Sequence, residues 1–271
     1  MGNQYGQAGK STRYTAKRKR GHAVIYFFIA LIVILTGWFF LENSKILGLS
    51  GIAVLIILGI VMAAPRILDR ELRKNKKVER QYNQGARGEE QVGELLLQLS
   101  NDFVVMHDVV SPNGNIDHIV YDKRGNIFML ETKSHYGRVT AQGDQLRRDG
   151  HTFEKDVIKQ SLANSFWLKE KIETQLKVKA WITPVLVFTN AFVTFDKPIK
   201  GVYYTNKKYL LQFLQRTNAS SPAGLKLWEM RKNYFVSRIN MKNALWMFKR
   251  KSFVQLSDIW KLIPNIDKLS Y

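Results

Sequence analysis

Two long uncharged stretches dominate the hydropathy pattern near the start of the chain. Residues 23–41 read AVIYFFIALIVILTGWFFL and residues 46–64 read ILGLSGIAVLIILGIVMAA, without a charged side chain in either. A helix of this length covers about 30 Å, the thickness of the hydrocarbon layer of a bilayer. Because only the residues 42–45 separate the two stretches, the pattern predicts a transmembrane helical hairpin rather than a buried soluble helix or a cleaved signal peptide.

From Gly85 onward the pattern changes to short apolar runs and amphipathic stretches. Apolar positions at helical spacing near residues 89–99 precede three runs, FVVMHDVV, NIDHIVYD and NIFMLETK, that are typical of strands in hairpins. Further along we expect a helix, two strands and a closing helix, at residues 154–177, 183–188, 201–204 and 207–215. This order predicts an α/β domain with a central mixed sheet flanked by helices.

Composition excludes several classes of protein. The 271 residues are 45% hydrophobic, which excludes a wholly disordered chain, and none of them is cysteine. Disulfides, cysteine zinc sites, iron–sulfur clusters and thiol catalysis are therefore excluded. The chain also lacks the GxxxxGK[ST], HExxH and GxSxG motifs, so nothing indicates an ATPase, a zinc protease or a lipase.

The net charge of +20 is concentrated around the apolar hairpin and in the tail. Six basic and no acidic residues lie in 1–22, and seven basic against three acidic residues lie in 66–84. Basic flanks on both sides predict cytoplasmic ends, and they also attract anionic lipid headgroups. The predicted organisation is a basic N-terminus, two transmembrane helices, a basic linker, an α/β domain and a C-terminal extension, at residues 1–22, 23–65, 66–84, 85–216 and 217–271.

The extension at 217–271 mixes basic and aromatic residues, with ten Lys and Arg against three acids. Basic groups follow phosphates and aromatic rings stack on bases, so a nucleic-acid clamp is one interpretation. A small helical appendage whose aromatics pack on the core is the other. The sequence leaves both open.

Candidate chemistry lies in the third strand of the domain. With a period of two, Glu131 and Lys133 project from one face while Leu130 and Thr132 project from the other. A salt-bridged strand end would explain this pair. Asp117 in the preceding strand changes the balance, because the hairpin can place it beside Glu131.

Two carboxylates and an ammonium at one end of a sheet suit metal-assisted phosphodiester hydrolysis. Asp117, Glu131 and the Thr132 backbone carbonyl supply hard oxygen ligands for Mg²⁺ or Mn²⁺. Such an ion neutralises phosphate charge and acidifies water. Lys133 is suited to orient the attacking water or to stabilise charge on the phosphoryl oxygens.

Two helical residues extend this set. Glu89 falls roughly 70° from the centre of its helix's apolar stripe, so it points toward the interior and offers a further metal ligand. Its alternative role is a boundary glutamate in a first helical turn, which the helix dipole favours. Gln160 on the later helix is placed to orient Lys133 or the water through its amide.

These motifs together resemble a known family, the nuclease-related domain, NERD, of the PD-(D/E)XK nuclease-like superfamily. They are, in order, Gly85-x-x-Gly88-Glu89-x-x-Val92, Ile116-Asp117-His118, Glu131-Thr132-Lys133, Tyr136-Gly137 and Gln160. The resemblance covers residues 84–215 and implies a restriction-endonuclease-like core. The site that it implies consists of Glu89, Asp117, Glu131, Lys133 and Gln160. His118 is expected to be structural or to contact phosphate rather than to bind metal.

The sequence thus leads to the hypothesis of a membrane-anchored, cytoplasm-facing nuclease that uses Mg²⁺ or Mn²⁺, with DNA favoured over RNA as substrate. Its partners would be nucleic acid and the lipid bilayer, and a multi-pass anchor without cysteine fits a bacterial inner membrane. A non-catalytic module of the same fold, holding nucleic acid or a protein at the membrane, is the alternative. A purely structural membrane scaffold is the third possibility.

Overall fold

The computed structural model describes residues 3–43, 46, 50–194 and 197–236. Its contacts divide the chain into two units: Ser11–Gln84, and Met1–Lys10 together with Gly85–Tyr271. Most of the basic and aromatic extension predicted at 217–271 lies outside the described residues, because the description ends at residue 236.

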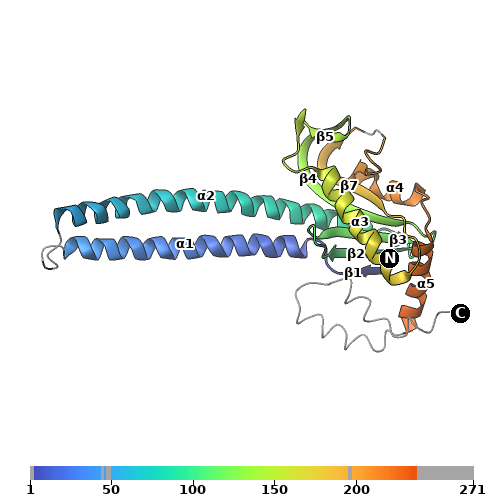
Figure 1. Ribbon diagram of the computed structural model, residues 1–271, viewed down its shortest axis with the longest axis horizontal. Coiled ribbons are helices and arrows are strands. Elements are labelled where there is room, and N and C mark those ends of the chain that lie inside the picture. The colour runs from blue at the N-terminus through green and yellow to red at the C-terminus, as the bar shows by residue number, and fades with distance from the viewer. Residues whose placement is uncertain (1–2, 44–45, 47–49, 195–196, 237–271) are drawn as a thin grey trace. The chain divides into compact units, whose positions relative to one another are not determined.

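Two helices long and apolar enough to cross a membrane form the first unit, as predicted (Figure 1). They are α1 (Lys10–Glu42) and α2 (Gly51–Leu96), and residues 85–96 of α2 belong to the second unit. In the most apolar 18-residue stretch of each helix, only 6% of the residues of α1 and none of those of α2 are buried. The helices approach closely at Gly37, where a Cβ atom would collide with Val61.

Residues 66–84, predicted as a linker, are helical throughout. The second helix was predicted to begin at residue 46, but α2 begins at Gly51, five residues later. The helix then continues without a break past Pro65, the residue that follows the apolar run. Many of its long-chain residues after Pro65 are Lys, Arg, Glu and Gln, which lose little rotamer freedom in a helix, so helical propensity accounts for the continuation.

The second unit is built around an eight-stranded mixed sheet. The strands β2 to β6 pair antiparallel in chain order, while β7 lies parallel to both β4 and β8, and β1 parallel to β2. The strands are β1 (Asn3–Tyr5), β2 (Phe103–Val109), β3 (Ile116–Asp122), β4 (Ile127–Gln142), β5 (Gln145–Arg148), β6 (His151–Thr152), β7 (Thr183–Val193) and β8 (Tyr203–Asn206). The helices are α3 (Val157–Leu176), the short 3-10 helix η1 (Lys207–Tyr209), α4 (Leu210–Arg216) and α5 (Pro222–Val236).

This architecture confirms the predicted mixed α/β fold with flanking helices. Each strand expected after Gly85 is present, although β4 runs to Gln142 rather than stopping at Lys133. Strands β1, β5 and β6 were not predicted. The extension of β4 is stabilised by its parallel pairing with β7, from Phe128↔Thr183 to Val139↔Val193, which is a long-range contact that local periodicity does not reveal.

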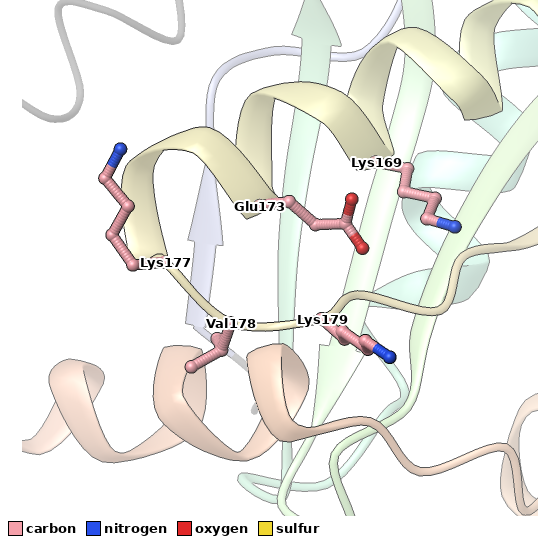
Figure 2. A pocket seen from close by; sticks show the side chains of 5 residues that line it. All are labelled: Lys169, Glu173, Lys177, Val178 and Lys179. Atoms are coloured by element: carbon pink, nitrogen blue, oxygen red, sulfur yellow. The ribbon is translucent and has the colours of Figure 1, made fainter.

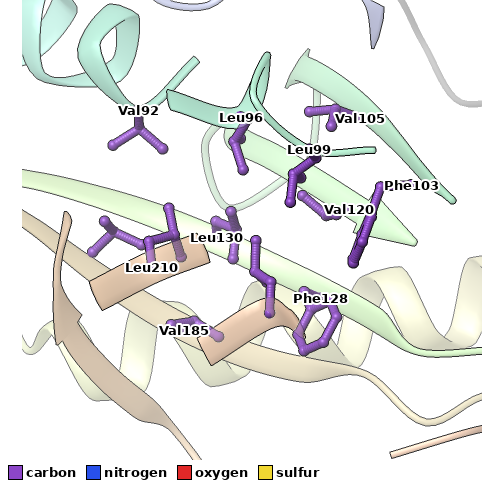
Figure 3. Packing of buried hydrophobic residues seen from close by; sticks show 12 residues of the cluster. Val92, Leu96, Leu99, Phe103, Val105, Val120, Phe128, Leu130, Val185 and Leu210 are labelled. Carbon is purple, nitrogen blue, oxygen red and sulfur yellow. The ribbon is translucent and has the colours of Figure 1, made fainter. Parts of the chain in front are cut away.

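Alternation along β4 places its side chains in two different cores. Phe128 and Leu130 pack with Val92 and Leu96 of α2 (Figure 3). Ile127 and Met129 instead pack with apolar residues of α3. Each fully buried side chain of this kind contributes about 1.5–3 kcal/mol. Continued in the same alternation, β4 turns its next odd-numbered residues toward α3.

The first part of the extension after residue 216 packs on the domain as a helix. Ala223 of α5 is fully buried, and Leu227 and Met230 pack against the same core as α3. The Arg231 guanidinium lies 4.3 Å from the centre of the Trp228 ring. These residues are helical, as the appendage interpretation expects, and the side chains that pack on the core here are Ala223, Leu227 and Met230.

Candidate active site

The two strand carboxylates meet where β3 and β4 stop pairing. Their ladder ends at His118↔Leu130, and the next residues along each strand are Asp117 and Glu131. Asp117 Oδ2 accepts a hydrogen bond of 2.6 Å from the Thr132 backbone N–H. A side chain thus takes the place of a ladder partner, and it fixes the Asp117 carboxylate beside the ExK segment.

A triangle of hydrogen bonds joins β4 to α3 at this point. Lys133 Nζ donates to Glu131 Oε1 at 2.9 Å and to Gln160 Oε1 at 3.3 Å. Gln160 Nε2 donates to the same Glu131 Oε1 at 3.1 Å. Gln160 lies in the first turn of α3, which begins after Asp156, whose carboxylate caps the helix by accepting from Lys159 N. The predicted common face of Glu131 and Lys133 is therefore present, and the structure brings Gln160 to it.

Glu89 reaches the same region from α2. Its neighbour Gly88 lies so close to the sheet that a Cβ atom there would be 2.9 Å from Ser134 Cβ and 3.3 Å from Thr189 Oγ1. Glu89 is only 9% exposed, and its negative charge acts on Asp117. The glycine in the Gly88-Glu89 motif thus permits the close helix–sheet approach that brings the glutamate to the strands.

Burial and like charge together determine the electrostatics of Asp117. Burial raises the pKa of Asp117 well above its ordinary value, and the carboxylates of Glu131 and Glu89 raise it further. The Thr132 hydrogen bond and the Lys133 charge oppose that rise. The region holds more negative charge than Lys133 compensates, which is the electrostatic setting in which a divalent cation binds.

One buried oxygen of this cluster suggests the position of such a cation. Glu131 is 5% exposed, and its Oε2 atom has no hydrogen-bond partner among the described residues. An unsatisfied buried carboxylate oxygen is costly unless another ligand occupies it. The described residues contain no group of three His, Asp or Glu arranged as a metal cage. The two strand carboxylates, Asp117 and Glu131, are the kind of donors that Mg²⁺ takes, because this ion binds one or two carboxylates and keeps several waters.

The predicted structural role of His118 agrees with its position. His118 is fully buried, and its Nδ1 atom lies 2.7 Å from His107 Nδ1. Burial lowers the pKa of His107 to about 4 and that of His118 well below its ordinary range, so the pair is neutral. His107 Nε2 also contacts Gln4 Oε1 at 3.0 Å. Neither His107 nor Gln4 was singled out from the sequence, since only the tertiary structure reveals that they meet.

A separate hollow of about 530 Å³ lies at the C-terminal end of α3 (Figure 2). It is lined by Lys169, Glu173, Lys177, Val178 and Lys179. None of these belongs to the acid–lysine cluster, by which we mean Glu89, Asp117, Glu131, Lys133 and Gln160. Glu173 Oε1 accepts from Ala180 N at 2.9 Å, so its carboxylate is used to hold the following loop.

Fold and cluster together define an α/β domain with an acid–acid–lysine site at the divergence of two strands. Comparison with protein families gives this class a name: the model described as the nuclease-related domain, NERD, matches residues 84–189. The chain therefore carries a nuclease-related domain, which confirms the resemblance, although the match ends before residue 215. Searches of curated proteins and of solved structures found no match.

Proposed function

We propose that this protein is a membrane-anchored, divalent-metal-dependent nuclease that hydrolyses phosphodiester bonds of DNA or RNA, with DNA the favoured substrate. The observation that carries the proposal is the convergence of Asp117, Glu131 and Lys133 beside an unsatisfied carboxylate oxygen, inside a nuclease-related domain. A salt-bridged strand end would not need Asp117, whose buried charge is costly without a cation.

Each side chain of the site has a separate role in the proposed hydrolysis. Asp117, Glu131 and the Thr132 carbonyl would hold Mg²⁺ or Mn²⁺, and Glu89 would add negative charge nearby or hold a metal-bound water. The bound ion would neutralise phosphate charge and acidify water. Lys133 has three Nζ protons and two described acceptors, Glu131 and Gln160, so one donor is available to a phosphoryl oxygen or the attacking water. Gln160 keeps that ammonium in place.

The apolar hairpin supports the membrane part of the proposal. Large apolar side chains along α1 and α2 are exposed, among them Ile32, Trp38 and Ile52 at 62%, 65% and 72%. Exposed apolar surface of this extent is stable in lipid and not in water. Strand β1 precedes α1 and belongs to the same unit as the domain after α2. This shared unit supports the proposal that both outer ends of the hairpin lie on the same side of the membrane, and the basic flanks support the cytoplasmic side. We place the protein in a bacterial inner membrane.

Metal removal tests the enzymatic proposal. We expect the full chain, purified in detergent micelles, to cut labelled single-stranded DNA, duplex DNA or RNA with Mg²⁺ or Mn²⁺ and to lose all cutting in EDTA. Restoring Mn²⁺ should restore the activity. If the folded protein binds Mn²⁺ but cuts none of the three substrates, it is not a general nuclease; binding of nucleic acid without metal binding would favour the non-catalytic module.

An exposed aromatic and basic patch on the paired strands β4 and β7, beyond the carboxylates, favours nucleic acid as the ligand. Phe192 and Tyr136 are 64% and 67% exposed, and both lie within a few residues of the cluster along paired strands. The Arg138 guanidinium lies 5.3 Å from the centre of the Phe192 ring. Exposed rings stack on bases, and an arginine held over such a ring contacts phosphates or bases.

We expect Phe192→Ala to weaken binding of single-stranded oligonucleotides about 5- to 150-fold, since stacking contributes roughly 1–3 kcal/mol per base. Arg138→Ala should also lower the slope of affinity against salt concentration by about one. Phe166, likewise 64% exposed but on α3, provides the matched control, and Phe166→Ala should bind as the wild type does. Fluorescence anisotropy with the full chain measures all three variants. Equal losses for Phe192→Ala and Phe166→Ala would contradict a specific binding role for the patch.

A further inference from the structure

The strand β1 comes from the far side of the apolar hairpin in sequence, yet it is part of the domain's sheet. It pairs parallel with β2, from Asn3↔Val104 to Tyr5↔Met106. The helix α1 begins at Lys10, a few residues after the strand ends. The chain thus enters the domain, leaves it through α1 and α2, and returns to it at Gly85.

The contacts after β1 indicate a shaped docking site rather than a loose edge. Gly6 has φ of +83°, and a Cβ atom there would lie 2.5 Å from the His107 carbonyl oxygen. At Gly9 a Cβ atom would lie 2.9 Å from the Ala86 carbonyl oxygen. On the domain side, a Cβ atom at Gly93 would lie 2.8 Å from Ala8 Cβ. The glycines of the N-terminal segment and Gly93 of the domain therefore let the two backbones lie closer together than any residue with a Cβ atom would allow.

A row of side chains leads from β1 to the residue next to Asp117. Gln4 Oε1 can only accept, so His107 donates to it from Nε2, and His107 Nδ1 then accepts from His118 Nδ1. His107 and His118 are direct cross-strand partners on β2 and β3. His118 is also the last residue of β3 that pairs with β4, and Asp117 follows where the strands diverge.

We propose that docking of residues 3–9 positions Asp117 through Gln4, His107 and His118, so that the site is complete only while β1 is held on β2. Gln4, His107 and His118 are then positioning residues. The inference rests on the proposed function for its significance, whereas the geometry that it predicts does not depend on metal or catalysis. Because α1 follows β1 directly, the segment that the site requires lies immediately before the membrane anchor in sequence.

Amide hydrogen exchange on the full chain in micelles tests this, because the Thr132 N–H bonded to Asp117 reports the position of that carboxylate. We expect Gly6→Val to undock β1, to raise exchange over β2, and to raise exchange at Thr132 about tenfold. Exchange over residues 183–188 of β7, in the core, should stay unchanged. Gly201 has the same φ, +82°, with no atom within 4 Å of its Cβ position, so Gly201→Val reproduces the backbone strain without the collision and should change neither β2 nor Thr132.

Side-chain variants separate the row of contacts from the strand pairing. Gln4→Leu removes the acceptor for His107 and should raise Thr132 exchange, whereas Gln4→Glu keeps an acceptor and should not. Faster exchange over β2 with no change at Thr132 would overturn the proposal and leave β1 as an edge cover. If Gly6→Val leaves β2 protected, deletion of residues 3–9 decides: unchanged Thr132 exchange in that variant overturns the proposal.

If the deletion raises Thr132 exchange, a synthetic peptide of residues 1–9 added to that variant should restore protection, and the same peptide with Gly6→Val should not. These readouts need neither metal nor substrate. A wild type that fails to bind Mn²⁺ would therefore contradict the nuclease and leave this test intact. Conversely, if the deletion variant still cuts at the full Mn²⁺-dependent rate, the positioning role is contradicted while the nuclease proposal stands.

Discussion

Replacing Lys133 by methionine is expected to lower metal-dependent phosphodiester hydrolysis about 10²–10³-fold, the usual cost of removing one charged or hydrogen-bonding group from a developing oxyanion. Methionine keeps much of the length of the side chain while removing its donors. The measurement is the initial rate of cutting by the full chain at saturating Mn²⁺. Lys159, an exposed residue beside Gln160 on α3, is the matched control, and Lys159→Met should cut at the wild-type rate.

The loss must be separated from a loss of folding. Lys133→Met leaves Glu131 buried without its cation, and breaking a buried pair this way destabilises by about 3–5 kcal/mol. The double variant Glu131→Gln, Lys133→Met removes both charges and should recover much of that stability, as measured by thermal unfolding, while staying inactive. A stable double variant that still hydrolyses its substrate would show that the pair is an ordinary strand-end salt bridge.

Replacing Asp117 by asparagine is expected to have opposite effects on metal binding and on stability. The amide oxygen can still accept from Thr132 N–H, but the negative charge offered to the cation is lost, so Mn²⁺ affinity should fall about 100-fold or more. Without metal the variant should unfold at a higher temperature than the wild type, because it no longer buries a charge beside Glu131 and Glu89. Each 1 kcal/mol gained raises the midpoint by about 2–4 °C for a chain of this size.

The pH dependence follows from the direction of the Asp117 pKa shift. Its folded-state pKa lies above the unfolded value, so this group stabilises the metal-free fold at low pH and loses that contribution as pH rises through the folded pKa. Its metal-binding form is the ionised one, so Mn²⁺ affinity should increase with pH over the same range. Asp117→Asn should abolish the part of both trends that comes from this group. If metal-free Asp117→Asn is less stable than the wild type at pH 8, the carboxylate is satisfied by the protein alone and needs no cation.

These two variants also separate the main alternatives. A non-catalytic module would keep its nucleic-acid affinity in both, because neither Lys133 nor Asp117 is part of the exposed patch at Arg138 and Phe192. A nuclease loses turnover in both and metal affinity chiefly in Asp117→Asn. Loss of binding and cutting together in Phe192→Ala would place the patch on the path of the substrate.

Local sequence determined the elements of this protein and the faces of its strands. Uncharged runs at 23–41 and 46–64 can satisfy their backbone only as helices in a membrane, and two long apolar helices are present. A period of two put Glu131 and Lys133 on one face, and the structure has them in contact. The order of the strands β2, β3, β4, β7 and β8 and of the helices between and after them was also readable, because these elements carry their own periodicity and turn residues, whereas β1, β5 and β6 were not predicted.

Long-range pairing decided the length of β4, the Asp117 contact and the formation of β1, none of which local periodicity encodes. The length of β4 depends on β7, more than forty residues later in the chain. Asp117 meets the Thr132 amide only because the β3–β4 ladder ends one residue earlier. The three residues of β1 gain their strand structure from β2 alone. Sequence thus identified which side chains carry the candidate chemistry, whereas only the tertiary structure could show what holds them in place, since those contacts join segments that share no local pattern.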